Sequence, residues 1–526
     1  MSKHYDAVII GAGHNGLVTA AYLAKAGMQV LVLEARKVLG GAAATQEVFP
    51  GFKFNTGAED AGLFRAEIIE QLNLPAFGLE FIEPPAAATY LFSGQNLTIW
   101  PHDLAKTQAE IRKFSAKDAD HYPEFLKLIE KFSAALKRIN FQSPPDVFDL
   151  SLGDALTWGP IALAIRQMGG DDMMEFLRVL PMSAKEFLDE HFESEPLKAL
   201  LGTAAVSGTF QGPYSAGTAF IFLSQQLGET SSTGNRLTRA VKGGMGQLSA
   251  SLGAAAQKYG AEVRTDARVR QVLLDNGTAK GVLLKSGEEI HARLVVSNAD
   301  PRRTLFDLVG PPQLEPRVMR RVRNIKFRGS LAKLNFALSS LPDFPNGLSA
   351  DQLSGKIVIC PSLEYLEHAY DDARMGGISQ HPYLEIHVPT LLDASLAPDG
   401  QHILSVNFKY APYQLKERSW DASKEELARI TLDTLETQIP GLAGRIRHQQ
   451  VITPLDLERE YGLTEGSIYH GQMTLDQLLI MRPIPDYARY ATQIENLYLC
   501  GAGTHPGGGV TGAPGYLAAK EILKSK

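Results

Sequence analysis

The chain has 526 residues, 44% of them hydrophobic and 21% charged, and this length is enough for two or three domains with substantial cores. Its formal net charge of -6 at pH 7 argues against nucleic acid as the main partner. Because its two cysteines, Cys360 and Cys500, lie in separate segments without a CxxC pair, we do not expect dithiol chemistry beside a cofactor.

A glycine fingerprint follows the first predicted strand, which begins near Tyr5, and a second strand, 29–33, ends at an acidic residue. The first glycine permits a tight turn, the second lets backbone N–H groups approach a pyrophosphate, and the third lets the following helix pack closely. The helix N-terminus favours phosphate, and the acid can accept two ribose hydroxyls of an adenosine. The predicted cofactor contacts here are Gly11, Ala12, Gly13, Asn15, Gly16 and Glu34.

A second glycine motif follows the acidic residue without a break, where a nicotinamide dehydrogenase would usually begin another helix. Its glycine pair removes side chains where a long extended cofactor passes the backbone, which favours a flavin over NAD, with an ordinary loop as the alternative. The segment 51–58 is predicted as a short strand and turn at the flavin's ribityl or ring end. The predicted contacts in both segments are Ala35, Arg36, Gly40, Gly41, Ala42, Thr45, Thr56, Gly57 and Ala58.

The residues from about 103 to 235 have a helical pattern, and Ser183 and Glu186 have the spacing of a capping box. The stretch 158–188 is rich in Ile, Met, Phe and Leu. It is compatible with plain helical core, a lid over an apolar substrate, a membrane-surface element or a subunit interface. We predict that it borders the substrate chamber, because an apolar substrate needs a cover that excludes water.

A block beginning near Arg239 returns to the pattern of a nucleotide-binding domain. A helix is predicted over 247–259, and strands follow over 262–264, 268–274, 281–285 and 294–297, with a hairpin turn at Asp275-Asn276-Gly277. From 301 to about 490 the chain is rich in strands, including 331–338, 383–388 and 402–408, and a helix spans 425–438. The alternation predicts an antiparallel sheet that backs the substrate chamber.

The last predicted strand, 496–500, runs into a glycine-rich segment, 501–513, and a final helix over 514–524. The spacing differs from that of a dinucleotide fingerprint, and no ribose acid follows. The glycines instead let backbone lie against a flat ring, while two N–H groups at the helix start stabilise charge on a reduced flavin. The predicted contacts are Gly501, Ala502, Val510, Thr511 and Ala513. Since no cysteine stands in the loop after Gly501, we expect FAD to bind non-covalently.

Together with the segment 243–248, these motifs resemble the phytoene desaturase branch of FAD-dependent amine-oxidase-like enzymes over almost the whole chain. His470-Gly471, Arg482-Pro483 and the stretch 500–515 are most similar to the non-carotenogenic subgroup named pyridine nucleotide-disulphide oxidoreductase domain-containing protein 2. One departure is Lys242, where relatives commonly have proline. The resemblance implies an α/β fold, with a Rossmann-like FAD-binding domain, an α+β substrate domain and a helical insertion.

The resemblance also implies roles for single residues. In relatives a valine at the position of Val269 exchanges backbone hydrogen bonds with adenine, and Asn298 is a further predicted cofactor contact. The segments around His470, Arg482 and His505 approach flavin and substrate in relatives. His505 is the first residue to test as a proton handler, with a structural histidine as the alternative, and no catalytic acid or base is assigned.

The expected division assigns three pieces, 1–90, 239–300 and 491–526, to the FAD-binding domain. A helical substrate or lid region takes 91–238, and a substrate domain with an antiparallel sheet takes 301–490. No room precedes the first strand for a targeting peptide, and no apolar run is long enough to cross a bilayer. We therefore expect a cytoplasmic protein, with peripheral membrane contact as an open alternative.

The expected function is that of an FAD-dependent oxidoreductase, which desaturates or oxidises an apolar, isoprenoid or lipid-like, small molecule by hydride transfer to flavin N5. The chain has no nucleophile elbow, no HExxH motif and no metal-ligand spacing. The electron acceptor, with oxygen or a quinone as candidates, and the oligomeric state stay open. Two alternatives are a flavin-dependent isomerase and a non-catalytic FAD protein that acts through a protein partner.

Overall fold

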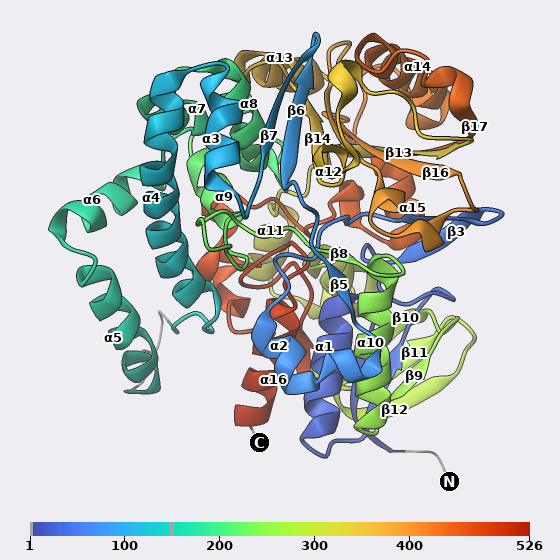
Figure 1. Cartoon of the computed structure of the whole chain (residues 1–526). Helices are drawn as coiled ribbons and strands as arrows, with labels where there is room; N and C mark the ends of the chain where they lie inside the picture. Colours follow the sequence, from blue (N-terminus) through green and yellow to red (C-terminus); the bar gives the residue numbers. More distant parts are fainter. Residues whose placement is uncertain (1–3, 147–151, 526) are drawn as a thin grey trace.

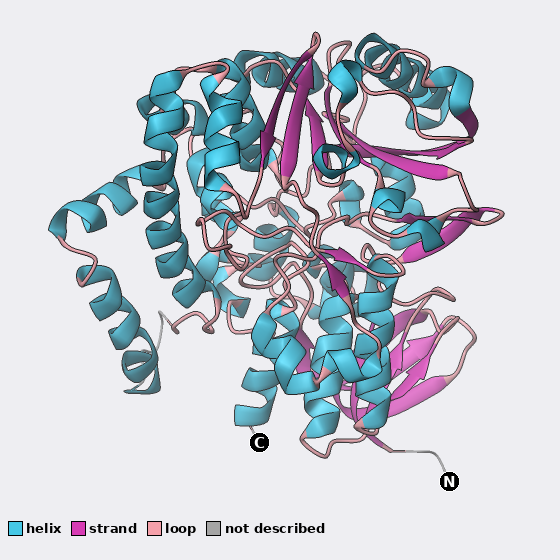
Figure 2. Cartoon of the chain, in the orientation of Figure 1, coloured by secondary structure: helices cyan, strands magenta, loops and turns pink. Residues whose placement is uncertain are grey.

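The computed structural model describes residues 4–146 and 152–525, and in this part of the chain two seven-stranded sheets divide the molecule (Figures 1 and 2). The first sheet has the strand order β10-β11-β12-β1-β2-β9, and β18 also pairs with β12. The second sheet has the order β17-β13-β16-β15-β14-β6-β7. Both termini lie at the end of the molecule that holds the first sheet (Figure 1).

The first sheet is assembled from three distant parts of the chain. Its parallel centre consists of β1 between β2 and β12, and β18 lies parallel to β12 on the other side. Helix α1 packs against α10 and α16, and together they cover one face of these strands. The elements are β1 (Tyr5–Ile10), α1 (His14–Lys25), β2 (Val30–Leu33), α10 (Met245–Lys258), β9 (Glu262–Arg264), β10 (Val269–Asp275), β11 (Thr278–Leu284), β12 (Glu289–Ser297), β18 (Leu497–Leu499) and α16 (Ala513–Lys524).

The predicted hairpin between β10 and β11 is present. Asp275 pairs with Thr278, and the two residues between them, Asn276 and Gly277, have φ of 48° and 81°. A two-residue turn of this kind requires positive φ at both positions, which asparagine and glycine adopt at low cost. The local sequence therefore determines this turn without help from the rest of the fold.

The second sheet is antiparallel except where β14 runs parallel to β6. Its strands are β6 (Ala88–Phe92), β7 (Gln95–Ile99), β13 (Leu331–Leu338), β14 (Lys356–Ile359), β15 (Tyr383–His387), β16 (His402–Lys409) and β17 (Ile446–Ile452). The strand predicted over 331–338 is confirmed. The pair β6 and β7 extends this sheet from a part of the chain that straddles the boundary expected at residue 90.

Helix α14 (Trp420–Gln438) covers the apolar face of the second sheet. It begins five residues before the predicted start at 425, because the Ser419 side chain accepts a hydrogen bond from the Ala422 N–H and caps the helix there. Its Trp420 and Leu427 pack in one core cluster with Phe408 of β16. This face is an ordinary dry core.

The helical region lies beside the second sheet, and α5 and α6 project away from the body of the molecule (Figure 1). The predicted capping box of Ser183 and Glu186 is present at the start of α7. Aromatic side chains of α4, α6, α7 and α9 share one core cluster. The helices are α3 (Leu104–Arg112), α4 (Ala116–Asn140), α5 (Leu152–Arg166), α6 (Gly170–Val179), α7 (Ala184–His191), α8 (Glu195–Gly202) and α9 (Thr218–Ser224).

Smaller elements join these parts. The remaining helices and strands are β3 (Thr45–Phe49), β4 (Phe52–Asn55), α2 (Ala66–Leu72), β5 (Phe81–Ile82), β8 (Ala240–Val241), α11 (Pro316–Arg323), α12 (Ala350–Leu353), α13 (Leu363–Arg374) and α15 (Pro454–Tyr461). The arrangement confirms the expected α/β class with a helical insertion. Within the described residues, no helix combines the length and apolarity needed to cross a bilayer.

Candidate active site between the two sheets

The fingerprint loop after β1 has the tight turn that its glycines predict. The Gly11 N–H donates to the Leu33 carbonyl at 2.8 Å. A Cβ atom at Gly16 would lie 2.3 Å from the Gly11 carbonyl oxygen, so α1 can begin this close to the strand only with glycine there. The buried Glu34 carboxylate accepts hydrogen bonds from the backbone N–H groups of Ala12, at 2.8 Å, and Arg36, at 2.9 Å. These contacts fix the acid beside the loop.

The second glycine motif folds back onto the fingerprint. The Gly40 N–H donates to the Ala12 carbonyl at 2.8 Å, and Gly40 forms a parallel bridge with Gly13. Gly40 and Gly41 have φ of 108° and 58°, a region that favours glycine. The motif therefore lies directly beside the fingerprint, which fits the predicted passage of a long cofactor.

The C-terminal glycine segment completes this junction. The Cys500 N–H donates to the Ser297 carbonyl at 2.9 Å, and a Cβ at Gly501 would lie 2.6 Å from the Asn298 carbonyl oxygen. On the helical side, the Thr19 hydroxyl donates to the Gly515 carbonyl at 2.9 Å. The first and the last parts of the chain thus meet at the carboxyl edge of the first sheet, where open α/β sheets bind their ligands.

The predicted cofactor contacts fall into three groups. Those gathered at the carboxyl edge of β1, β2 and β12 and the start of β10 are Gly11, Ala12, Gly13, Asn15, Gly16, Glu34, Ala35, Arg36, Val269 and Asn298. A cavity lies between the two sheets, and the predicted contacts that line it are Ala42, Gly57, Ala58, Ala502 and Val510. Those outside the cavity wall are Gly40, Gly41, Thr45, Thr56, Gly501, Thr511 and Ala513.

Thr45 has a different visible role from the one predicted. Its hydroxyl donates to the Asn55 side-chain oxygen at 2.7 Å and accepts a hydrogen bond from the Gly246 N–H at 2.8 Å, in the first turn of α10. The residue therefore joins the β3–β4 hairpin to that helix.

Unpaired polar atoms at the carboxyl edge fit a dinucleotide. His14 Nε2, Asn15 Oδ1 and Arg36 Nη1 are buried and have no hydrogen-bond partner among the described residues. Such atoms cost free energy unless a bound group satisfies them, and native proteins leave few of them unpaired. A donor and acceptor set at a helix N-terminus, beside the Glu34 carboxylate, suits the phosphates and hydroxyls of FAD.

His470 and Arg482 lie beside the C-terminal glycine segment. Burial lowers the pKa of Arg482 to about 9, and its guanidinium donates to the carbonyls of Tyr469 and Ala502, each at 2.7 Å, which joins the loop around residue 470 to the glycine segment. A Cβ at Gly501 would lie 3.2 Å from His470 Nδ1, and burial lowers the pKa of His470. Neither residue lines the cavity.

His505 lies in the glycine-rich segment that follows β18. It is buried, and burial lowers the pKa of its ring to about 3. Its side chain lies off the cavity wall, and both ring nitrogens are without a hydrogen-bond partner among the described residues. The structural alternative expects a hydrogen bond within the glycine-rich loop, which the ring nitrogens lack among the described residues, so the proton-handling role of His505 stays a prediction.

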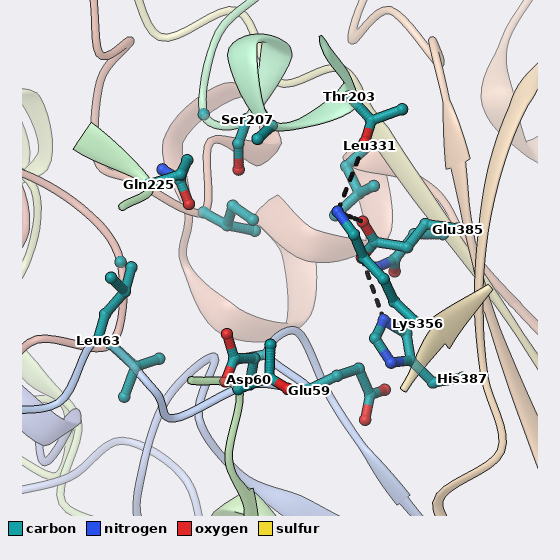
Figure 3. Close-up of a pocket in the computed structure, with 18 of the residues that line it drawn as sticks. Glu59, Asp60, Leu63, Thr203, Ser207, Gln225, Leu331, Lys356, Glu385 and His387 are labelled. Atoms are coloured by element: carbon teal, nitrogen blue, oxygen red, sulfur yellow. Dashed lines mark hydrogen bonds and ion pairs between the residues drawn. The ribbon is translucent and has the colours of Figure 1, made fainter. Parts of the chain in front are cut away.

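A cavity of about 390 Å³ opens between the two sheets and the helical region (Figure 3). Its flavin-side wall comes from the glycine motifs, and apolar side chains such as Leu63, Leu200 and Leu331 line other parts. The far wall is the second sheet. The cavity thus connects the predicted flavin end with the substrate side of the molecule.

The sheet wall of this cavity is polar, although its other face is a dry core. Along β15 the side chains alternate, so that Leu384 and Ile386 enter the apolar cluster while Tyr383, Glu385 and His387 line the cavity. The neighbouring strands continue the pattern, because Glu385 pairs with Asn407 and Tyr383 with Lys409. Figure 3 shows Lys356, Glu385 and His387 grouped on this side.

Two ion pairs lie between the flavin side and the sheet. Glu59 and Lys333 are 5% and 2% exposed, and the Lys333 ammonium contacts both the Glu59 carboxylate and, at 2.6 Å, the Asn55 carbonyl. Burial raises the pKa of Glu59, but the charges of Lys333 and His387 together with hydrogen bonds from Lys333 and Asn55 outweigh it and hold the pKa below its usual value. Asp60 pairs with Arg236 at 2.7 Å and accepts from the N–H groups of Gly62 and Arg239.

These charged residues were absent from the sequence-based site, although a signal existed. The strands 331–338, 383–388 and 402–408 alternate apolar and polar residues, and the polar set was compatible with a solvated face. Several of the polar residues are instead buried, for example Lys333 and Lys409. Charged residues at alternate positions of central strands in one sheet are the pattern that could have indicated a polar chamber wall.

The stretch 158–188, predicted as a lid, does not line the cavity of the structure. No cavity-lining residue in the described part of the chain comes from this stretch. Phe176 of α6 is buried against Phe132 of α4, with ring centroids 5.4 Å apart, while Met174 and Leu177 are exposed. The stretch therefore packs partly as helical core, and the helical side of the chamber wall comes mainly from α8, α9 and the segment that joins them.

A family model for "Flavin containing amine oxidoreductase" matches residues 16–523. The chain belongs to this family. It is 35% identical, over its whole length and 94% of the relative's, to pyridine nucleotide-disulfide oxidoreductase domain-containing protein 2 of Rattus norvegicus. It is also 27% identical to phytoene desaturase (lycopene-forming) of Pantoea ananas, over 96% of both chains. The carrot enzyme, prolycopene isomerase of Daucus carota, is 25% identical over 97% of this chain and 78% of its own.

A solved structure supports the same fold. Putrescine oxidase bound to putrescine superposes with a TM-score of 0.60 at 18% identity, and the match covers 100% of both chains. These findings confirm the resemblance to phytoene desaturase-like enzymes and to the subgroup of the rat protein. The chain is an oxidoreductase of a flavin-dependent family, and flavin is its cofactor.

Proposed function

We propose that the protein binds FAD non-covalently and oxidises or desaturates a largely apolar small molecule that enters the 390 Å³ cavity. The observation that carries the proposal is the convergence of three distant glycine segments, with unpaired buried polar atoms, on one end of that cavity. Both cysteines are buried, and neither lies in the glycine segment after residue 500, which supports a non-covalent cofactor.

When bound, FAD supplies a hydride acceptor at N5 of its ring. The protein's own residues have the other tasks. Ala42, Ala58 and Val510 present small or apolar surface at the flavin end and keep water from it. The N–H groups at the start of α16 favour negative charge at this end of the site.

The first experiment tests the cofactor. Protein purified without added flavin should be yellow, and denaturation should release FAD into the supernatant. Flavin that stays with the precipitated chain would contradict non-covalent binding, and FMN in the supernatant would contradict FAD.

The second experiment tests the reaction. The holoprotein is mixed anaerobically with a panel of isoprenoid and lipid substrates, and flavin absorbance is followed. Bleaching by a substrate, together with a product that has lost two hydrogens, is the expected result. Readmitting oxygen or adding a quinone then identifies the electron acceptor from the rate at which the colour returns.

A flavin-dependent isomerase is the second candidate, and the similarity to prolycopene isomerase favours it. In that case product forms only after the flavin has first been reduced, and the product has the same mass as the substrate. The third alternative, a non-catalytic FAD protein, predicts flavin that no substrate bleaches and a stable complex with a protein partner.

We also propose a cytoplasmic location with reversible contact to a membrane surface. Leu152, Leu156 and Leu163 of the projecting helix α5 are exposed, which supports this contact. Flotation with liposomes tests it, and Leu156→Asp should reduce the floated fraction. Full flotation of that variant would contradict a contact through α5.

A further inference from the structure

We propose that the sheet wall of the cavity binds an oxyanion head group, a carboxylate or a phosphate, so that the substrate is an amphiphile rather than a pure hydrocarbon. The anchors are Lys356 of β14 and Lys409 of β16. The inference rests on the proposed function, since it assigns a substrate class to the same chamber.

The acidic groups on the chamber wall are already saturated. The Glu385 carboxylate accepts from the Tyr383 hydroxyl at 2.9 Å, from His387 Nε2 at 3.1 Å and from the Asn407 amide at 3.1 Å. These donors and Lys356 hold its pKa below the usual range although burial alone would raise it. Asp60 and Glu59 are likewise committed to Arg236 and Lys333. A cationic substrate group would have to displace one of these partners.

The lysines on the same wall are not saturated. The closest polar atoms around the Lys356 ammonium are the Thr203 hydroxyl at 3.5 Å and a Glu385 oxygen at 3.8 Å, and its side chain is 25% exposed to the cavity. Lys409 is buried and contacts the Val206 carbonyl, the one hydrogen-bond acceptor found for it among the described residues. An ammonium has three N–H donors, so both lysines keep donors for a ligand.

The charge balance of the wall points the same way. Lys356 and Lys409 flank the single carboxylate of Glu385, because Glu385 on β15 lies between β14 and β16. Burial lowers the pKa of Lys409 to about 7, so the wall is net positive when this amine is protonated beside Lys356. Buried charges of this kind are costly unless they are paired. A second oxyanion, supplied by the ligand, balances them. The Asn407 side-chain oxygen, which has no partner among the described residues, is left to accept from a protonated or hydroxylated head.

Apolar side chains in the same cavity can contact the rest of the ligand. Leu63 after the β3–β4 hairpin, Leu200 and Leu201 of α8 and Leu331 of β13 line it. An oxyanion at the lysines would therefore leave an apolar chain extending toward the flavin end. The head anchors the molecule, and a carbon along the chain is the part that reaches the flavin side.

The test uses the FAD-loaded protein and measures binding alone, by calorimetry. Decanoate should bind at least about tenfold more tightly than decan-1-ol, since a charge-assisted hydrogen bond is lost with the alcohol. Lys356→Gln should weaken decanoate binding about tenfold and leave decan-1-ol unchanged, while Lys356→Arg should retain most of the affinity. Lys280→Gln, an exposed lysine of β11 outside the cavity, is the matched control.

Three results would overturn the proposal: equal binding of decanoate and decan-1-ol, unchanged decanoate affinity in Lys356→Gln, or decylamine as the tightest of the three ligands. Decyl phosphate distinguishes the two oxyanions, because whichever of it and decanoate binds more tightly identifies the head group. The Lys409→Gln variant should also weaken decanoate binding, and its result counts only if its FAD content is normal. If its FAD content is reduced, the Lys356 variants decide the test. Since no turnover is measured, a failure here leaves the flavin chemistry standing, whereas a flavin that no substrate reduces leaves the anion site standing.

Discussion

At the scale of single residues, the buried pair of Glu59 and Lys333 shows how charge is accommodated inside this protein. Both side chains are nearly inaccessible, and Asn55 satisfies further hydrogen bonds of each through its amide and its carbonyl. A buried pair of this kind gains little over an apolar pair, but removing one partner leaves an unpaired charge. The pair therefore restricts which substitutions are tolerated at Glu59 and Lys333.

We expect Lys333→Met to lower the free energy of unfolding by about 3–5 kcal/mol, because Glu59 would stay buried without its partner. Urea denaturation measures the loss. The double variant Lys333→Met/Glu59→Gln should recover part of it, and a double variant as unstable as the single one would contradict the ion-pair account.

The pH dependence of the same pair follows from the lowered pKa of Glu59. A carboxyl whose folded pKa is depressed adds stability above its unfolded value of about 4.3, and this contribution is lost as pH falls through the folded pKa. Acid unfolding of Glu59→Gln should therefore show a shallower fall in stability below about pH 4 than the wild type. Parallel curves for the two proteins would mean that Glu59 is not ionised in the folded state.

Glu34 has the most direct effect on the cofactor. Glu34→Ala should weaken FAD binding at least about tenfold, because each ribose hydroxyl loses a charged acceptor that contributes about 1.5–3 kcal/mol. Retention of FAD in a dilution series measures this. Glu289→Ala, an exposed acid of β12 in the same sheet, is the control, and equal FAD occupancy in the two variants would refute the role of Glu34.

At the scale of elements, helices α5 and α6 differ in how they are packed. Phe176 of α6 is 2% exposed, whereas Leu156 of α5 is 79% exposed. Phe176→Asp should lower the melting temperature markedly, because a charge would be buried in the aromatic cluster. Leu156→Asp should change stability by no more than about 0.5 kcal/mol. Normal melting of Phe176→Asp combined with lost flavin reduction would instead restore the lid interpretation.

The first sheet could be predicted well because its signals are local. The fingerprint, the acid at Glu34 and the turn at Asn276-Gly277 each lie within a few residues of the structure that they specify. The same holds for the capping box at Ser183. Where the residues that specify a strand or helix lie within it or directly beside it in sequence, the element begins within a few residues of the predicted position.

The second sheet was less accessible to prediction. Its parallel pair joins β6 near residue 90 with β14 near residue 357, and no short-range pattern indicates that contact. The orientation of its faces was also open, because alternation shows that one face differs from the other without showing which is buried. The site was therefore predicted at its flavin end, and the lysines and acids of its far wall were missed.

At the scale of the whole molecule, binding of FAD should stabilise the complete fold. The cofactor contacts predicted here come from the beginning, the middle and the end of the chain, so a ligand that binds only when these parts are assembled shifts unfolding by mass action. FAD at a hundred times its Kd should add about 2.7 kcal/mol. A melting curve of the apoprotein that does not shift with added FAD would contradict a shared site.

Because the first sheet closes with strands that are distant in sequence, we expect flavin binding to come late in the synthesis of the chain. β1 pairs with β12, and β12 pairs with β18, so the glycine segment near residue 501 emerges from the ribosome after both of the strands that it joins. The opening fingerprint is complete within the first few dozen residues, but the glycine segment near residue 501 that completes the junction is translated much later. We expect a chain interrupted anywhere before β18 to stay colourless, because it lacks the predicted contacts of the last glycine segment.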